Sequence, residues 1–102
     1  MKKNGLSRCQ QELLDFLGEQ YTVAHIDHLD CIYRDFGDYD VEICGGRTIR
    51  APFQVYVCQK RPSLHTIHCF PDLPHDLSQV AALLHLIALQ YDTHHKEENE
   101  HE

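Results

Sequence analysis

Apolar and acidic residues alternate in the middle of the chain, and this alternation restricts the fold more than any other feature. Tyr39, Val41 and Ile43 share one side of the run, and Asp40 and Glu42 share the other. Successive side chains of a β-strand point to opposite faces, so the run predicts a half-buried strand with one wet, acidic face. Such a strand is typical of an antiparallel sheet that is packed on one face only.

Turn signals and further β-like runs lie on both sides of this strand. A Gly-Asp pair at 37–38 joins it to a preceding run at 31–36, which is typical of a tight hairpin. Two glycines at 45–46 predict a turn after it. Residues 53–59 then alternate in the same way and predict another strand.

The two ends of this β region are less sharply marked. A run at 64–70 predicts a further strand, which we expect Pro71 to end, because proline cannot donate to a sheet ladder. The run at 21–26 is rich in β-forming residues and is either a strand or an extended connection. We therefore expect three to four antiparallel strands, connected as a meander by short turns.

A helix is predicted before the β region. Ser7 and Gln10 have the spacing of a capping box, in which each side chain bonds the backbone of the other residue. Apolar residues follow at helical spacing as far as Gly18, which can end a helix in a left-handed conformation. We expect this helix to cover residues 8–18.

A second helix is predicted after the β region, over residues 75–92. Its apolar residues recur at intervals of three and four, which is the pattern of a helix that buries one face. Either Asp76 or Asp72 is expected to cap it. Pro74 fits the preference of proline for the first turn of a helix.

Together these patterns predict an α+β fold with the element order α-β-β-β-β-α. Both helices must bury an apolar stripe, so we expect them on one face of a small antiparallel sheet of three to four strands. In this interpretation residues 1–92 form a single domain, and residues 93–102 form a flexible tail rich in acidic residues and histidine.

The second predicted helix has more apolar surface than one stripe requires. Leu83, Leu86 and Leu89 lie away from its main stripe and make it apolar nearly all round. A helix on the surface of a small protein normally keeps a polar side. The three leucines therefore predict an interface, with a second copy or another partner. The alternative is that the helix is central and the first helix packs across it.

The charges of the chain are unevenly distributed. The net charge is -7, and nine acidic residues lie between Glu12 and Glu42 against one basic residue. Carboxylates on alternate strand positions are roughly 7 Å apart, which is close to the spacing of phosphates along a nucleic-acid strand. We expect an acidic partner-binding surface on the predicted hairpin, made of Asp35, Asp38, Asp40 and Glu42.

In size and charge only, such a protein resembles the small acidic inhibitors encoded by phages, which occupy the basic channel of a nucleic-acid enzyme. This resemblance implies a non-enzymatic interaction protein that binds, and by binding inhibits, a macromolecular partner. The acidic residues alternatively pair with bases on neighbouring strands, which would neutralise the surface.

A second hypothesis starts from the region 44–71, which has four basic residues and no acidic one. Basic strands with an aromatic residue can follow phosphates and stack a base. The residues of this alternative nucleic-acid patch are Arg47, Arg50, Tyr56, Lys60 and Arg61. Because nucleic-acid readers are normally basic and this chain is acidic, we expect a protein partner rather than direct nucleic-acid binding.

The second hypothesis also includes metal binding. His25, His28 and Cys31 are three residues apart and span a predicted turn, where their side chains can converge. No standard zinc-finger spacing is present, so we assign no metal ligand and no cofactor. No nucleophile motif, phosphate-binding loop or desolvated carboxylate pair indicates catalysis either. The chain is therefore expected to act by binding and not as an enzyme.

The cysteines suggest where the chain works. There are five, an odd number, and none forms a CxxC pair. With no apolar signal segment and no run of about 18 apolar residues, this pattern predicts reduced thiols in the cytoplasm and no membrane span.

Overall fold

The computed structural model describes residues 5–26, 28–48 and 50–92. Two helices enclose a run of strands along the chain. The elements are α1 (Arg8–Leu17), β1 (Thr22–Ile26), β2 (Leu29–Asp35), β3 (Tyr39–Gly45), β4 (Phe53–Gln59), β5 (His65–Leu73) and α2 (Leu77–Tyr91). The predicted tail at 93–102 lies outside the described residues, and within them no helix has the length and apolar character needed to cross a membrane.

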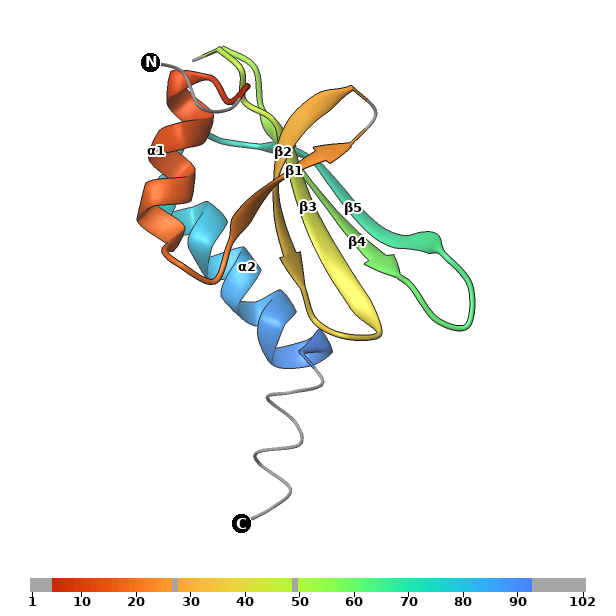
Figure 1. Cartoon of the computed structure of the whole chain (residues 1–102). Helices are drawn as coiled ribbons and strands as arrows, with labels where there is room; N and C mark the ends of the chain where they lie inside the picture. Colours follow the sequence, from red (N-terminus) through yellow and green to blue (C-terminus); the bar gives the residue numbers. More distant parts are fainter. Residues whose placement is uncertain (1–4, 27, 49, 93–102) are drawn as a thin grey trace.

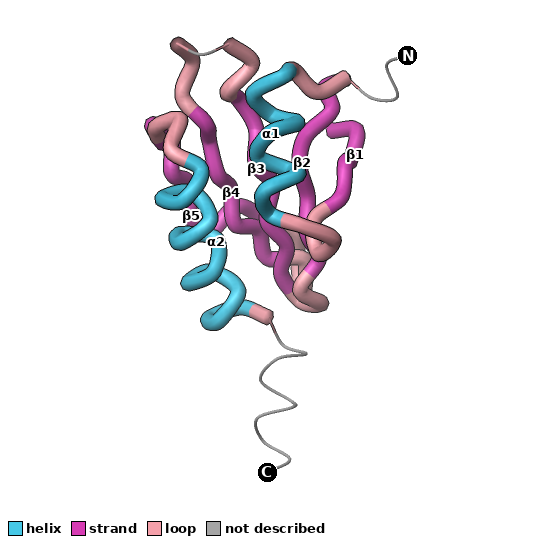
Figure 2. The backbone as a smooth tube through the Cα atoms, turned by 90° about the vertical axis from the view of Figure 1, so that its left-hand side faces the viewer, coloured by secondary structure: helices cyan, strands magenta, loops and turns pink. Residues whose placement is uncertain are grey.

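The strands form one antiparallel sheet, in which each strand pairs with its neighbour in the chain. The order is β1-β2-β3-β4-β5, a simple meander. Both helices lie against the same face of the sheet, α2 along β3 to β5 and α1 beside it (Figures 1 and 2). The predicted α+β class and the placement of both helices on one face are therefore confirmed.

The predicted number of strands was wrong, because the sheet has five. Residues 22–26 form a true strand, β1, which pairs with β2 along its whole length. The alternative of an extended connection failed because these β-forming residues also find a partner strand at the edge of the sheet. The element order is thus α-β-β-β-β-β-α.

Two proline positions also differ from the prediction. β5 continues through Pro71 to Leu73. An edge strand tolerates a residue without an N–H donor, and the pairing of β4 with β5 is also irregular, with shifts of register. Pro74 lies before the N-cap of α2 and not in its first turn. The cap is Asp76, whose carboxylate accepts a hydrogen bond from the backbone of Gln79 at 3.1 Å.

The core lies between the helices and the sheet. Alternation in β3 and β4 directs one set of side chains at the helices, and these side chains are almost fully buried. α1 and α2 contribute Leu13, Val80, Leu84 and Ile87. The strands and their connections contribute Ile32, Phe36, Val41, Ile43, Phe53, Val55 and Val57.

Polar contacts attach each helix to the sheet. The capping box of α1 forms as predicted, and its buried Gln10 also donates to the carbonyl of Gly45 at 2.6 Å. At the other end of the layer, Arg34 donates to Asp92 at 3.2 Å, just after α2. The Arg34 guanidinium also lies over the rings of Tyr21 and Phe36, at 5.4 and 5.0 Å from their centroids. These contacts hold both helices on one face and leave the other face open.

Candidate functional site on the open face of the sheet

The face of the sheet away from the helices is the candidate site. It carries the second set of alternating side chains, which the core does not use. From β2 to β4 these are mostly polar or sulfur-containing, and they include Cys31, Tyr33, Asp40, Glu42, Cys44, Gln54, Tyr56 and Cys58. The alternation predicted a solvent-exposed acidic face. The observed face differs, because it mixes carboxylates with thiol, amide and phenol groups.

This face is hollowed into a trough with a volume of about 580 Å³. Glu42, Tyr56 and Cys58 are among the side chains that line it, and the β1–β2 and β4–β5 hairpins flank it. Each hairpin places an apolar side chain beside the trough: Leu29 is 48% exposed and Leu64 is 76% exposed. The trough therefore has a polar, thiol-containing floor between two apolar rims.

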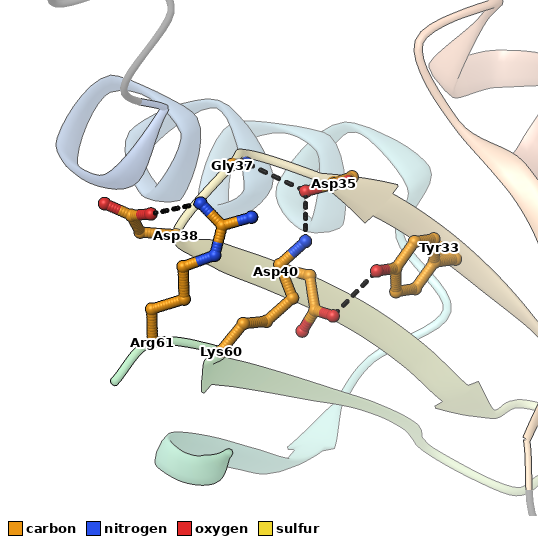
Figure 3. Close-up of polar contacts among 7 residues, drawn as sticks. All are labelled: Tyr33, Asp35, Gly37, Asp38, Asp40, Lys60 and Arg61. Atoms are coloured by element: carbon orange, nitrogen blue, oxygen red, sulfur yellow. Dashed lines mark hydrogen bonds and ion pairs between the residues drawn. The ribbon is translucent and has the colours of Figure 1, made fainter. Parts of the chain in front are cut away.

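The four carboxylates of the predicted acidic surface do not form one exposed row. Asp35 accepts from Lys60 at 2.6 Å, and Asp38 accepts from Arg61 at 3.4 Å (Figure 3). Both basic residues come from the turn after β4, which the meander places beside the β2–β3 hairpin. Acids and bases thus pair across neighbouring strands, the alternative that the sequence left open.

Asp40 is buried instead of exposed. Only 6% of its surface is accessible, and its Oδ2 accepts a hydrogen bond from the Tyr33 hydroxyl at 2.7 Å (Figure 3). Burial, and then this hydrogen bond, raise the pKa of Tyr33 well above its usual value. The Oδ1 atom of Asp40 is also buried and has no hydrogen-bond partner in the described part of the chain.

Glu42 faces the trough floor, close to Asp40 and to a thiol from the next strand. One ligand atom each from Asp40, Glu42 and Cys58 lie within 4.8 Å of one another. Cys58 is directly opposite Asp40 in the β3–β4 register, and its Sγ lies 4.0 Å from Glu42 Oε2. Burial raises the pKa of the Cys58 thiol; the Thr66 hydroxyl opposes this shift, and the Glu42 charge adds to it.

A second thiol pair lies beside this cluster. Cys31 and Cys44 occupy facing positions on β2 and β3, with their Sγ atoms 3.0 Å apart and no disulfide between them. Burial and the contact with Cys31 raise the pKa of Cys44, which favours the protonated thiol at that position.

The alternative nucleic-acid patch is divided by the fold. Arg47 and Arg50 precede β4, whereas Lys60 and Arg61 follow it, so the two pairs are separated by a strand roughly 20 Å long. Tyr56 lies between them in the trough. Lys60 and Arg61 already pair with acids.

The predicted histidine and cysteine cluster does not converge. His25 is opposite Asp30 and Ala24 is opposite Cys31, so His25 and Cys31 project from opposite faces of the β1–β2 pair. His25 instead contacts Asp30 at 2.9 Å, and this hydrogen bond, with a second from the Gly5 backbone, lowers the pKa of Asp30. In the described ranges, none of these histidines belongs to a ligand group of three.

The three leucines of α2 separate into two environments. Leu83 is partly buried against the core, while Leu86 and Leu89 are exposed on the outer side of the helix.

The sequence did not single out Leu29, Leu64, Tyr33 or Cys58. The alternation of residues 53–59 already placed Cys58 on the open face, but only the register of β3 with β4 brings it to Asp40.

Comparisons of this chain with protein-family models, with curated proteins and with solved structures give no match.

Proposed function

We propose that this chain is a non-enzymatic interaction protein that binds a segment of another protein in the trough on the open face of its sheet. The observation that carries the proposal is the trough itself, about 580 Å³ in volume and bordered by exposed Leu29 and Leu64. Exposed apolar side chains around a concave surface are a usual mark of a binding site.

A protein segment fits these rims better than a small molecule does. A small ligand on the floor would leave both leucines in water, whereas a chain crossing the trough covers them and excludes water from the polar floor. Catalysis has less support. Among the described residues, no hydrogen bond joins a histidine ring to a cysteine thiol or a serine hydroxyl, the pairing that would activate a nucleophile.

The acidic surface remains a hypothesis for the same class of function. Ion pairs at Asp35 and Asp38 and the burial of Asp40 reduce the free charge that it offers. Inhibition of a nucleic-acid enzyme by phosphate mimicry therefore has less geometric support than binding in the trough. The two modes of binding differ in their salt dependence. Binding through the acidic surface should weaken as salt is added, because exposed charges are screened within roughly 10 Å at 0.1 M salt.

The test is partner capture from extracts of the source cells, with tagged protein carrying a photo-crosslinker at position 64. We expect one specific protein to be captured, and Leu64→Asp to weaken its affinity at least tenfold, because a charge replaces an apolar contact on the rim of the trough. Phe16→Asp is the matched control. Phe16 is an exposed apolar residue, 52% accessible, on α1 and away from the trough, so its variant keeps full affinity.

Three outcomes would contradict the proposal. One is equal capture by the Leu64→Asp and wild-type proteins. Another is an affinity that falls steeply between about 0.05 M and 0.5 M salt, which would favour the acidic surface. The third is purified material whose 260 to 280 nm absorbance ratio shows bound nucleic acid that salt releases, which would favour the basic patch.

A further inference from the structure

The cluster of Asp40, Glu42 and Cys58 has the geometry of a small cation site. Positions 40 and 42 share one face of β3, and position 58 is directly opposite 40 on β4, so the sheet itself converges the three side chains. Their ligand atoms lie within 4.8 Å of one another. Tetrahedral Zn²⁺ has bonds of about 2.0 to 2.3 Å, so its ligand atoms are roughly 3.3 to 3.8 Å apart. The three ligand atoms would have to move together by only about 1 Å to bind such an ion.

The buried carboxylate of Asp40 provides a second, independent observation at this cluster. Its Oδ1 is buried and has no hydrogen-bond partner in the described residues, and only 6% of the residue is exposed. A buried polar atom without a partner is costly, and native proteins rarely keep one. Figure 3 shows one oxygen turned to the Tyr33 hydroxyl and the other turned away from it.

The donor types narrow the class of cation. Ca²⁺ and Mg²⁺ prefer sites made only of oxygen ligands, which a thiol does not match. Cu(I) and other soft ions favour several sulfur or nitrogen ligands, whereas this cluster has two carboxylates. One thiolate with two carboxylates suits a borderline divalent ion such as Zn²⁺.

We propose that Asp40, Glu42 and Cys58 bind a divalent cation of the zinc class at the floor of the trough. Three protein ligands leave a fourth position open toward the trough, where water or a group of a bound molecule can complete the tetrahedron. Tyr33 acts as a positioning residue, because its hydroxyl holds the Asp40 carboxylate in orientation. The site belongs to the isolated chain and does not depend on the proposed protein partner.

Cobalt titration of the reduced full-length chain tests the proposal, because Co²⁺ replaces Zn²⁺ and a cobalt–thiolate bond absorbs in the near ultraviolet. We expect this absorption to saturate at one equivalent of Co²⁺ and to disappear when Zn²⁺ is added. Cys58→Ser should abolish it, and Asp40→Asn should weaken cobalt affinity at least tenfold. Tyr33→Phe should keep the absorption and weaken affinity about tenfold.

Cys69→Ser is the control, since Cys69 is an exposed cysteine on β5 outside the cluster, and its variant should match wild type. Cobalt held by the tail histidines His94, His95 and His101 would show no thiolate absorption and is thereby distinguished. A wild-type chain without the absorption, or a Cys58→Ser variant that retains it, overturns the proposal.

A melting curve supplies a second readout that does not depend on cobalt. Zn²⁺ should raise the melting temperature of wild type and of Cys69→Ser, because a ligand that binds only the folded chain stabilises it. Asp40→Asn keeps the side-chain volume, and its melting temperature should rise less than that of wild type when Zn²⁺ is added. An equal response of Asp40→Asn and wild type would count against the site.

Discussion

At the scale of single residues, the buried polar groups show how the sheet is attached to its helices. Tyr21 is almost fully buried between α1 and β1, with the Arg34 guanidinium over its ring. Burial raises the pKa of Tyr21, while Arg34 opposes the shift. The folded chain therefore holds this phenol protonated to a higher pH than the unfolded chain does.

This shift predicts a loss of stability at alkaline pH. The folded-state pKa lies above the unfolded value of about 10, so the contribution of Tyr21 is complete below that value and is lost as the pH rises through the folded pKa. Tyr21→Phe removes the titrating group, so its free energy of unfolding should fall less than that of wild type between about pH 8 and pH 11. Urea unfolding at both pH values measures the difference. Parallel losses in the two proteins would show that Tyr21 does not contribute.

At the scale of elements, β3 is the centre of the molecule. One face of the strand supplies Val41 and Ile43 to the core, and the other supplies Asp40, Glu42 and Cys44 to the open face. The pairing of β3 with β2 and β4 on its two sides decides which groups meet. The thiol pair Cys31–Cys44 follows from the first pairing, and the contact of Asp40 with Cys58 follows from the second.

The pairing of β2 with β3 predicts a reversible disulfide. Facing residues of antiparallel strands have Cα atoms about 4.5 to 5.5 Å apart, within the range that a disulfide bridges. Diamide should oxidise Cys31 and Cys44 to a disulfide by accepting their two protons and two electrons, and dithiothreitol should reverse the reaction. Thiol alkylation followed by peptide mass spectrometry identifies the bond.

Cys69 provides the internal control for this oxidation. It is exposed and lies on β5, whereas Cys31 and Cys44 lie on β2 and β3, so it should stay open to alkylation within the monomer. Oxidation that instead joins Cys69 to Cys58, or that gives only dimers linked between chains, would show that the β2–β3 register is different in solution.

At the scale of the whole molecule, apolar side chains are exposed on both layers of the described part of the chain. The rims of the trough lie on the open face of the sheet, and Leu86 and Leu89 lie on the outer side of α2. Neither surface packs against the core. Apolar groups exposed on a small protein lower the free energy of association when they are covered.

The outer face of α2 leads us to expect self-association at high micromolar concentration. Covering Leu86 and Leu89 on both copies would stabilise a dimer, and a charge at this face would oppose it. Light scattering on a size-exclusion column should show the wild-type dimer, whereas Leu86→Asp with Leu89→Asp should be monomeric. Phe16→Asp should leave the dimer intact. A wild-type chain that stays monomeric at these concentrations would remove the prediction.

Much of the fold could be predicted from short segments. The capping box of Ser7 and Gln10 and the alternation in 39–44 and 53–59 all have their predicted structures. These features depend on neighbours along the chain, whose steric and hydrogen-bonding preferences act locally. The fifth strand was not counted, because residues 22–26 become a strand only when β2 supplies their hydrogen bonds.

The sequence by itself determined the helices, the central strands and which residues occupy each strand face. Tertiary structure alone decided which groups meet: Asp35 with Lys60, Cys31 with Cys44, and Asp40 with Cys58. The physical reason is that contacts across a sheet depend on strand order and register, which the buried core selects as a whole. A carboxylate that alternation places on a wet face can therefore become a neutralised ion pair or a buried ligand, according to the strand beside it.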